Sequence, residues 1–161
     1  MELYSVGNIN NNDEIIQVSN LEKDLFSDYV NFWSLDTFEK ISNNKDQYIF
    51  KILKKDNKVI GYIIFLIIDT DTAELHKIAI SREYQGQGLS KWFFYVLFNE
   101  LKQKNITRII LEVMVDNISA IALYNSLGFK KIGIRKNYYK IKLENLNIVY
   151  KNSLVLKRGE D

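Results

Sequence analysis

The sequence predicts an α/β protein with a mixed central sheet flanked by helices, in a single domain over residues 1–161. Two observations predict this class. Some segments repeat apolar residues at helical spacing, whereas others form short alternating or β-branched runs that are typical of strands. An antiparallel hairpin comes first along the chain, and a strand–helix–strand–helix–strand series follows it. This order favours a sheet covered by helices over a barrel or a helical bundle.

The amino-terminal half is predicted to form two helices and four strands. Ile15, Val18 and Leu21 recur at helical spacing after a run of asparagines that offers a helix cap. Ser34 is a candidate cap for a second, shorter helix. The expected elements are a strand over Glu2–Val6, a helix from Asp13, a helix after Ser34, and strands over Tyr48–Leu53, Val59–Ile68 and Thr72–Ile80, with a polar hairpin connection over Lys54–Lys58.

The carboxy-terminal half continues with helices and strands in alternation. A long amphipathic segment follows two glycines, and a second helical segment is ended by Gly128. The expected elements are a helix over Ser90–Leu101, a strand over Arg108–Val115, a helix over Ile118–Leu127, extended structure from Phe129 to Tyr139, and a last strand over Ser153–Leu156.

Composition excludes several kinds of site. The chain has no cysteine, which excludes disulfides and thiolate ligands, and its single histidine, His76, argues against a metal centre. The longest apolar run is far shorter than the ~20 residues that span a bilayer, and no secretory signal is visible. We therefore expect a cytoplasmic protein without membrane contact. Basic residues gather in the second half of the chain. They either attract a polyanionic ligand or form an ordinary solvent-exposed, lysine-rich surface. We expect no direct nucleic-acid binding.

Gly86 and Gly88 lie between a predicted strand and a predicted helix. Glycines let the backbone approach a ligand closely, and the first free N–H groups of a helix attract phosphate. The sequence fits neither a nucleotide-triphosphate loop nor a dinucleotide fingerprint. The turn thus predicts a phosphorylated cofactor, although such a turn taken alone is more often only a tight connection.

Glu112 and Tyr124 are the candidate acid–base residues. Alternation places Glu112 with Ile110 and Met114 on a strand face that looks buried, where a carboxylate needs a partner or a catalytic role as a base. The alternative is a strand glutamate that is paired with a lysine or exposed at an edge. Tyr124 is predicted on the packed side of its helix, where a tyrosine usually belongs to the core.

From Glu74 to Tyr139 the chain resembles the GNAT family of N-acetyltransferases. The family pattern Gln/Arg-x-x-Gly-x-Gly/Ala is met by Gln85–Ser90, in which Ser90 departs at the last position. Within the family, the chain is most similar to the ribosomal-protein-alanine N-acetyltransferases (RimI type). The segments that carry this likeness are Trp33-Ser34, Ile78-Ala79-Ile80, Leu111-Glu112-Val113, Asn117, Ala120–Tyr124 and Ile134–Tyr139. After Tyr139 the match fades.

The resemblance implies a GNAT fold and direct transfer of an acetyl group from acetyl-CoA to an amine. It implies Glu112 as the base and Tyr124 as the acid, with Tyr124 also contacting the cofactor. No metal is expected, and His76 is expected to orient or pack beside the cleft. The implied cofactor-binding residues are Ile78, Ala79, Ile80, Gln85, Gly86, Gln87, Gly88, Leu89, Ser90, Lys91 and Asn117, and the implied acceptor-binding residues are Trp33, Arg135 and Tyr138.

The acceptor implied by the resemblance is the N-terminal alanine of a ribosomal protein. Arg135 is expected to pair with an acidic side chain near that terminus. Two alternatives stay open: an acetyltransferase that acts on a small amine or on another protein, and a non-catalytic sensor that only binds acetyl-CoA. The presence of both Glu112 and Tyr124 argues against the sensor.

Overall fold

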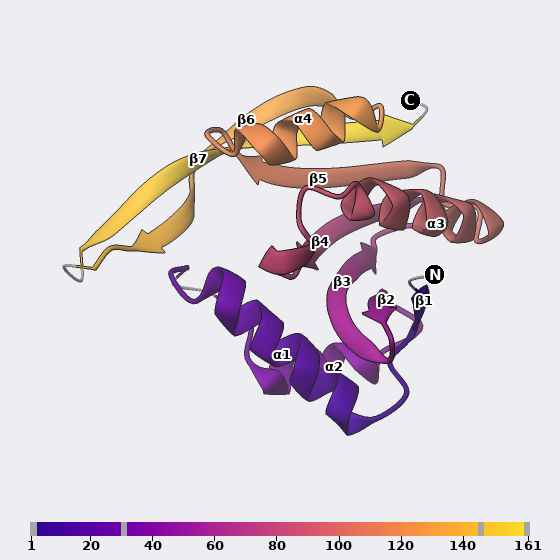
Figure 1. Cartoon of the computed structure of the whole chain (residues 1–161). Helices are drawn as coiled ribbons and strands as arrows, with labels where there is room; N and C mark the ends of the chain where they lie inside the picture. Colours follow the sequence, from indigo (N-terminus) through magenta and orange to yellow (C-terminus); the bar gives the residue numbers. More distant parts are fainter. Residues whose placement is uncertain (1–2, 30–31, 145–146, 160–161) are drawn as a thin grey trace.

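The strands of the molecule lie side by side in one sheet, in the order β1-β2-β3-β4-β5-β7-β6 (Figure 1). The structure is a computed structural model and describes residues 3–29, 32–144 and 147–159. Neighbouring strands are antiparallel except β4 and β5, which are parallel. The strands are β1 (Tyr4–Asn8), β2 (Tyr48–Lys55), β3 (Lys58–Ile67), β4 (Thr72–Ile80), β5 (Arg108–Met114), β6 (Lys130–Lys142) and β7 (Ile148–Gly159).

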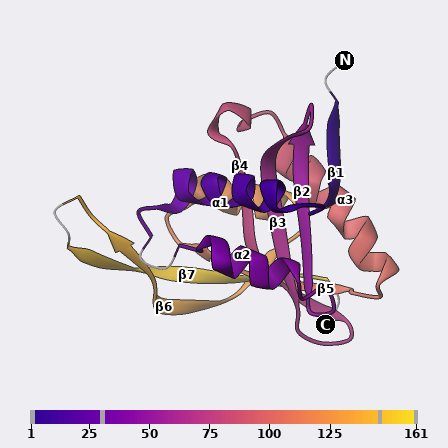
Figure 2. The same cartoon turned by 90° about the horizontal axis from the view of Figure 1, so that it is seen from below.

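Helices cover both faces of the sheet (Figure 1, Figure 2). The helices α1 (Asn12–Phe26) and α2 (Leu35–Ser42) pack on one face, around a core that contains Val18, Phe38 and Tyr62. On the other face, α3 (Leu89–Gln103) and α4 (Ile118–Ser126) pack around Phe93, Phe94 and Leu111. The predicted mixed sheet flanked by helices is confirmed. None of the described helices is long and apolar enough to cross a membrane.

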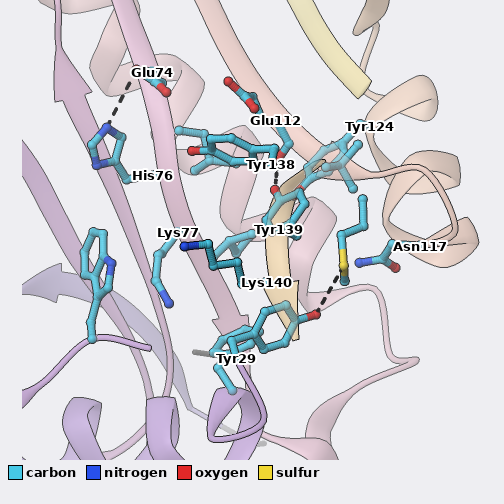
Figure 3. Close-up of a pocket in the computed structure, with 16 residues that line it drawn as sticks. Tyr29, Glu74, His76, Lys77, Glu112, Asn117, Tyr124, Tyr138, Tyr139 and Lys140 are labelled. Carbon is cyan, nitrogen blue, oxygen red and sulfur yellow. Dashed lines mark hydrogen bonds and ion pairs between the residues drawn. The ribbon is translucent and has the colours of Figure 1, made fainter. Parts of the chain in front are cut away.

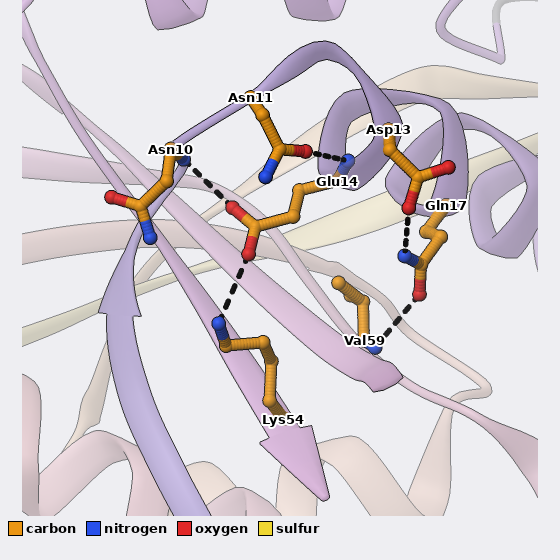
Figure 4. Close-up of polar contacts among 7 residues, drawn as sticks. All are labelled: Asn10, Asn11, Asp13, Glu14, Gln17, Lys54 and Val59. Carbon is orange, nitrogen blue, oxygen red and sulfur yellow. Dashed lines mark hydrogen bonds and ion pairs between the residues drawn. The ribbon is translucent and has the colours of Figure 1, made fainter. Parts of the chain in front are cut away.

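Polar contacts fix the start of α1 on the sheet (Figure 4). Asn11 caps the helix, because its Oδ1 accepts a hydrogen bond from the N–H of Glu14 over 2.9 Å. The Glu14 carboxylate in turn pairs with Lys54 Nζ on β2 at 3.0 Å. Gln17 Oε1 accepts from the backbone N–H of Val59 on β3 at 2.9 Å. The asparagine cap that the sequence predicts is therefore confirmed.

The cap of α2 and the first hairpin also follow the predictions. Ser34 Oγ accepts from the N–H of Thr37 over 3.3 Å at the start of α2. Between β2 and β3 the chain turns at Asp56 and Asn57, which both have positive φ angles of 48° and 69°. A two-residue turn of this kind matches the twist of the strands that it joins.

The carboxy-terminal strands are longer than predicted. The strand β7 runs over Ile148–Gly159 instead of Ser153–Leu156, and β6 continues past Tyr139 to Lys142. The strand β7 lies between β5 and β6, so ladder hydrogen bonds on both edges extend it through residues whose apolar pattern is weak. The first strand begins at Tyr4, and Glu2, the start of its predicted range, lies outside the described residues.

The parallel strands β4 and β5 separate along their length, and this separation positions the site. Their pairing joins Thr72 to Arg108 and ends where Leu75 faces Leu111. Farther along, the far end of β6 reaches the segment after α1, where Ile141 forms a β-bridge with Tyr29. The β6–β7 hairpin extends beyond the rest of the sheet beside the end of α1 (Figure 1). The opened strands and this hairpin together enclose a cavity.

Candidate active site

A cavity of about 490 Å³ opens where β4 and β5 separate (Figure 3). Its walls come from the end of α1 and the segment after it, from β4 and β5, from the N-cap and last turn of α4, and from β6. The cavity brings together six residues that the sequence predicts for the site: Trp33, Ile78, Glu112, Asn117, Tyr124 and Tyr138. These residues are up to 105 positions apart in sequence, between Trp33 and Tyr138.

Glu112 lies on β5 with donors on both oxygens of its carboxylate. Oε1 accepts from Arg135 Nη1 at 2.6 Å, and Oε2 accepts from Ser153 Oγ at 2.9 Å. The side chain is 13% exposed. The expectation that its strand face is buried is wrong, because Ile110 and Met114 are only half-buried and this face borders the cavity instead of a packed helix. Glu112 is thus a carboxylate at the cavity wall whose two oxygens are both fixed by hydrogen bonds.

Tyr124 is a core residue that also reaches the cavity (Figure 3). It is 7% exposed, and its ring packs edge-on against Phe94 and Phe129, with centroids 6.0 and 5.7 Å away. Burial raises the pKa of the phenol to about 12. The hydroxyl therefore stays protonated at neutral pH, as a proton donor requires.

A wide bulge in β6 shapes the wall opposite β4. Between Arg135, which faces Ser153, and Tyr139, which faces Lys151, β6 carries more residues than β7. Asn137 adopts a φ of 53° there and donates its N–H to Asn152 Oδ1 at 3.0 Å. Regular alternation would send successive residues to opposite faces, but the bulge brings both Tyr138 and Tyr139 to the cavity.

The bulge also explains how β6 holds Glu112. The Tyr139 hydroxyl donates to the backbone carbonyl of Glu112 at 3.0 Å, and burial raises the pKa of this phenol. Arg135 stacks over the ring of Tyr138, with 4.3 Å between the guanidinium carbon and the ring centroid. The hydrogen bond and the charge of Glu112 raise the pKa of the Arg135 guanidinium. Arg135 itself does not line the cavity, and it reaches the site through Glu112.

A buried charge network that the sequence did not reveal supports the wall of the cavity beside α1. Glu22 on α1 is fully buried and accepts hydrogen bonds from Lys77 Nζ, from the Tyr62 hydroxyl and, at 3.0 Å, from the Trp33 N–H. Burial lowers the pKa of Lys77, and the charge of Glu22 opposes this shift. Glu22 falls on the same helical stripe as Val18, and a carboxylate within an apolar stripe is the signal that could have revealed it.

Residues of β4 that precede Ile78 also line the cavity, and the sequence did not single them out as ligand contacts. His76 is an extra residue in β4, since Leu75 faces Phe65 and Lys77 faces Ile64 on β3. This bulge lets His76 and Lys77 both approach the α1/α2 side of the sheet, where His76 meets the ring of Trp33 with centroids 6.1 Å apart. Glu74 lines the cavity two residues before it. His76 packs beside the cleft as expected.

The glycine turn has the geometry of an anion site, although it lies outside the main cavity. Gly86 and Gly88 have φ angles of 76° and 78°. Gly88 is the N-cap residue of α3, and as a glycine it has no side chain that could bond to the first N–H groups of the helix. A Cβ atom at either glycine would meet nothing within 4 Å, so the space beside the turn is open. Gln85 Nε2 donates to the Ile80 carbonyl at 2.8 Å and ties the turn to β4. The first N–H groups of α3, over Leu89–Lys91, lack carbonyl partners within the helix.

Two further features involve residues that the sequence predicts for the cofactor. The edge of β4 that carries Ile78, Ala79 and Ile80 pairs with β3 on one side only, because pairing with β5 ends at Leu75. Asn117 caps α4 by accepting from the Ala120 N–H at 3.3 Å and also lines the cavity. Within the described parts of the chain, no three His, Cys, Asp or Glu side chains gather as a metal site would require.

Comparison with known proteins identifies the family. Residues 15–129 match the family model described as the Acetyltransferase (GNAT) family. The chain belongs to the GNAT family. It is therefore an N-acetyltransferase, and enzymes of this family use acetyl-CoA. The family resemblance and the fold class that the sequence predicts are both confirmed.

Similar proteins refine this assignment. The enzyme is 38% identical to the [ribosomal protein bS18]-alanine N-acetyltransferase of Escherichia coli K12 over 107 residues, which cover 66% of this chain and 70% of that protein. It is 36% identical over 115 residues to a putative enzyme of the same name from Bacillus subtilis 168, with 70% and 74% covered. The enzyme is thus of the RimI type.

Solved structures agree with this. The crystal structure of the Escherichia coli ribosomal-protein-S18-alanine N-acetyltransferase matches with a TM-score of 0.80 at 27% identity, covering 98% of this chain and 94% of that one. A GNAT acetyltransferase from Elizabethkingia anophelis with acetyl-CoA bound matches with a TM-score of 0.70 at 18% identity, covering 98% of each chain. This second likeness shows the shared fold alone.

Proposed function

We propose that the enzyme acetylates the α-amino group of an N-terminal alanine of a ribosomal protein by direct transfer from acetyl-CoA. The observation that carries the proposal is that Glu112 and Tyr124, the candidate base and acid, border one cavity at the separation of β4 and β5. The similarity to enzymes named for the alanine of ribosomal protein bS18 supports the choice of acceptor.

The residues along β4 and α3 fit acetyl-CoA. The unpaired edge at Ile78, Ala79 and Ile80 offers backbone groups to an extended pantetheine arm, as a neighbouring strand would. The open turn over Gln85–Lys91 fits the pyrophosphate, because helix N–H groups and positive-φ glycines form an anion site. Asn117 lines the cavity and is suited to hold the arm there. When bound, acetyl-CoA supplies the acetyl group as a thioester.

Glu112 is suited to take a proton from the acceptor amine. Each carboxylate oxygen has more than one acceptor position, so the hydrogen bonds from Arg135 and Ser153 orient the group and leave it able to accept another. An α-amine has a pKa ~2–3 units below that of a lysine side chain, so far more of it is neutral at pH 7. This difference favours an N-terminus over a lysine as the acceptor.

Tyr124 is suited to stabilise the departing thiolate. Its hydroxyl is protonated over the whole neutral range, because burial raises its pKa to about 12. A thiol has a pKa of ~8.5, so full proton transfer from this phenol to a thiolate is uphill. The phenol therefore acts mainly by donating a hydrogen bond to the sulfur as charge develops there.

Mass spectrometry of acetylated products tests the proposal. The enzyme is incubated with labelled acetyl-CoA and an equimolar mixture of an Ala-starting peptide, the same peptide with a blocked N-terminus and an internal lysine, and spermidine. We expect label on the α-amino group of the first peptide. Preference for spermidine would support the small-amine alternative, and absence of any turnover would support the sensor.

A further inference from the structure

Positive charge is concentrated in the β6–β7 hairpin. Residues 130–159 contain nine lysines and arginines and one acidic residue, Glu144, although the net charge of the whole chain is only +2. The strand β6 lies at the edge of the sheet, and the far end of the hairpin extends beyond the other strands (Figure 1). The excess of positive charge is therefore displayed on a projecting edge of the protein.

Only some of these cations have structural partners. Arg135 is paired with Glu112, and Lys151 is paired with Asp116. The guanidinium of Arg158 stacks on an aromatic ring of α3. Within the described residues, no ion pair engages the exposed lysines of β6, which are Lys130, Lys131, Lys136, Lys140 and Lys142. These lysines are the charges that a partner can reach.

Aromatic and aliphatic side chains are exposed beside these lysines. Lys140 faces Tyr150 across the hairpin, with its Nζ 5.9 Å from the ring centroid, and Tyr150 is 54% exposed. Lys142 faces Ile148, which is also exposed. Lysines on an edge strand can serve only to prevent pairing between molecules. A strand that is merely protected in this way has no need of exposed aromatic and aliphatic side chains beside the charges.

Lysines beside an exposed aromatic ring fit a single strand of nucleic acid. Its phosphates attract ammonium groups, and binding releases condensed counterions. Its bases stack on aromatic rings with little dependence on sequence. The 13 residues of β6 span about 40 Å at ~3.3 Å per residue, so the lysines can follow several nucleotides. An acidic polypeptide would match the charges alone, whereas a nucleic-acid strand offers both repeated negative charges and flat apolar faces.

We infer that the β6–β7 hairpin is a binding surface for single-stranded nucleic acid, with Lys131, Lys136 and Lys142 at the phosphates and Tyr150 stacked on a base. The inference goes beyond the proposed function, and only the choice of RNA as the strand that the enzyme meets rests on a ribosomal acceptor. The sequence alone predicts no direct nucleic-acid binding, because it does not show that the lysines and Tyr150 share one hairpin. Since β6 also lines the active-site cavity, a strand bound here lies beside the acceptor.

Fluorescence anisotropy tests the surface, with labelled RNA and DNA strands of one sequence and of about 12 nucleotides, within the ~4–16 that a small single-strand-binding domain covers. For about three to five phosphate contacts, the logarithm of the binding constant should fall with the logarithm of salt concentration with a slope of about −2 to −3.5. Combining Lys131→Gln, Lys136→Gln and Lys142→Gln should make this slope shallower by about 2. Tyr150→Ala should weaken binding on the order of tenfold and leave the slope unchanged, because stacking involves no counterion release.

The matched control combines Lys45→Gln, Lys102→Gln and Lys104→Gln, which change the net charge equally at exposed positions outside the hairpin. This variant should bind both strands as the unaltered enzyme does. Tighter binding of RNA than of DNA would indicate contacts with the 2′-hydroxyl groups, and equal binding would indicate contacts with phosphates and bases alone; both outcomes support the surface.

Three outcomes would overturn the inference: no binding by the unaltered enzyme at low salt, equal weakening by the two triple variants, or equally effective competition by polyglutamate. None of the three hairpin lysines that are changed lines the active-site cavity. The hairpin variant should therefore keep its kcat/KM on an Ala-starting peptide. Because acetylation of the peptide is measured separately from strand binding, failure of the inference and failure of the proposed function are distinguishable.

Discussion

Arg135 on β6 donates from Nη1 to Oε1 of Glu112 on β5 across 2.6 Å, over the intervening strand β7. Ser153 on β7 donates to the other oxygen. The carboxylate that is the candidate base is therefore oriented by residues from two further strands. This arrangement predicts that Arg135 acts on catalysis through Glu112 and not by direct contact with the acceptor.

Glu112→Gln tests the base. The change keeps the shape of the side chain and removes its basicity, so we expect kcat to fall by about 10²–10⁴-fold while the affinity for acetyl-CoA is nearly unchanged. Steady-state kinetics and calorimetric titration of acetyl-CoA measure the two quantities. A kcat like that of the unaltered enzyme across pH 6–9 would remove Glu112 from this role.

Arg135→Gln separates two roles for the arginine. If Arg135 orients Glu112, the change should lower kcat to a similar extent for peptides with acidic, neutral and basic side chains near the terminus. If Arg135 instead reads an acidic side chain, the loss should appear in kcat/KM for acidic peptides alone. Kinetics on the three peptide classes decide between them, and we expect the uniform loss.

Tyr124→Phe tests the hydrogen-bond donor. A hydrogen bond to a charged group contributes about 1.5–3 kcal/mol, so we expect kcat to fall by about 10- to 100-fold. The ring remains to pack against Phe94 and Phe129, so the fold should persist. Because the pKa of Tyr124 is raised to about 12, ionisation of this residue should leave rates at pH 6–9 unaffected.

The same pKa shift predicts a pH dependence of stability. The folded state holds the Tyr124 proton more tightly than the unfolded state, where the ordinary value of 10.0 applies. The resulting stabilisation is complete below pH 10 and is lost as pH rises through about 12. Urea unfolding at several alkaline pH values should show that the free energy of unfolding declines less steeply with pH in Tyr124→Phe than in the unaltered enzyme. Parallel declines would contradict a raised pKa at Tyr124.

Much of the fold could be predicted from local patterns, because caps, turns and apolar spacing act over a few residues. Asn11 and Ser34 cap the helices that the sequence predicts, and Gly86 and Gly88 lie in the predicted turn between β4 and α3. The length of β7 could not be predicted, since it depends on ladders with β5 and β6 that form only in the folded sheet.

The residues of the candidate site could be predicted where they belong to a sequence motif. They could not be predicted where their role depends on contacts between residues far apart in the sequence. Glu112 and Tyr124 were predicted for the site and both line the cavity, but the partners of Glu112 were not predicted, because Arg135 on β6 and Ser153 on β7 come near it only once these strands pair in the sheet. Glu22 was hidden for a similar reason. Its partners Lys77 and Tyr62 lie on two strands far from α1 in sequence.

A matched pair of variants at Gly88 tests the anion site. Asn and Asp both tolerate the positive φ of 78° better than other side chains, and they differ mainly in charge. We expect Gly88→Asp to weaken acetyl-CoA binding on the order of tenfold more than Gly88→Asn, because negative charge repels phosphate at a helix N-terminus. The thermal shift that saturating acetyl-CoA produces measures the difference; equal shifts would place the pyrophosphate elsewhere.

Glu22→Gln tests the buried network that supports Trp33. The change leaves the Lys77 ammonium in a buried site without its counter-charge, and breaking a buried ion pair in this way typically costs about 3–5 kcal/mol. Urea unfolding should show that loss. The double variant Glu22→Gln with Lys77→Met removes the stranded charge and should recover part of it. Because Glu22 also accepts from the Trp33 N–H, acceptor KM should rise while acetyl-CoA affinity holds. Equal stability of the single and double variants would show that the Lys77 charge left without a partner is not the cause of the loss.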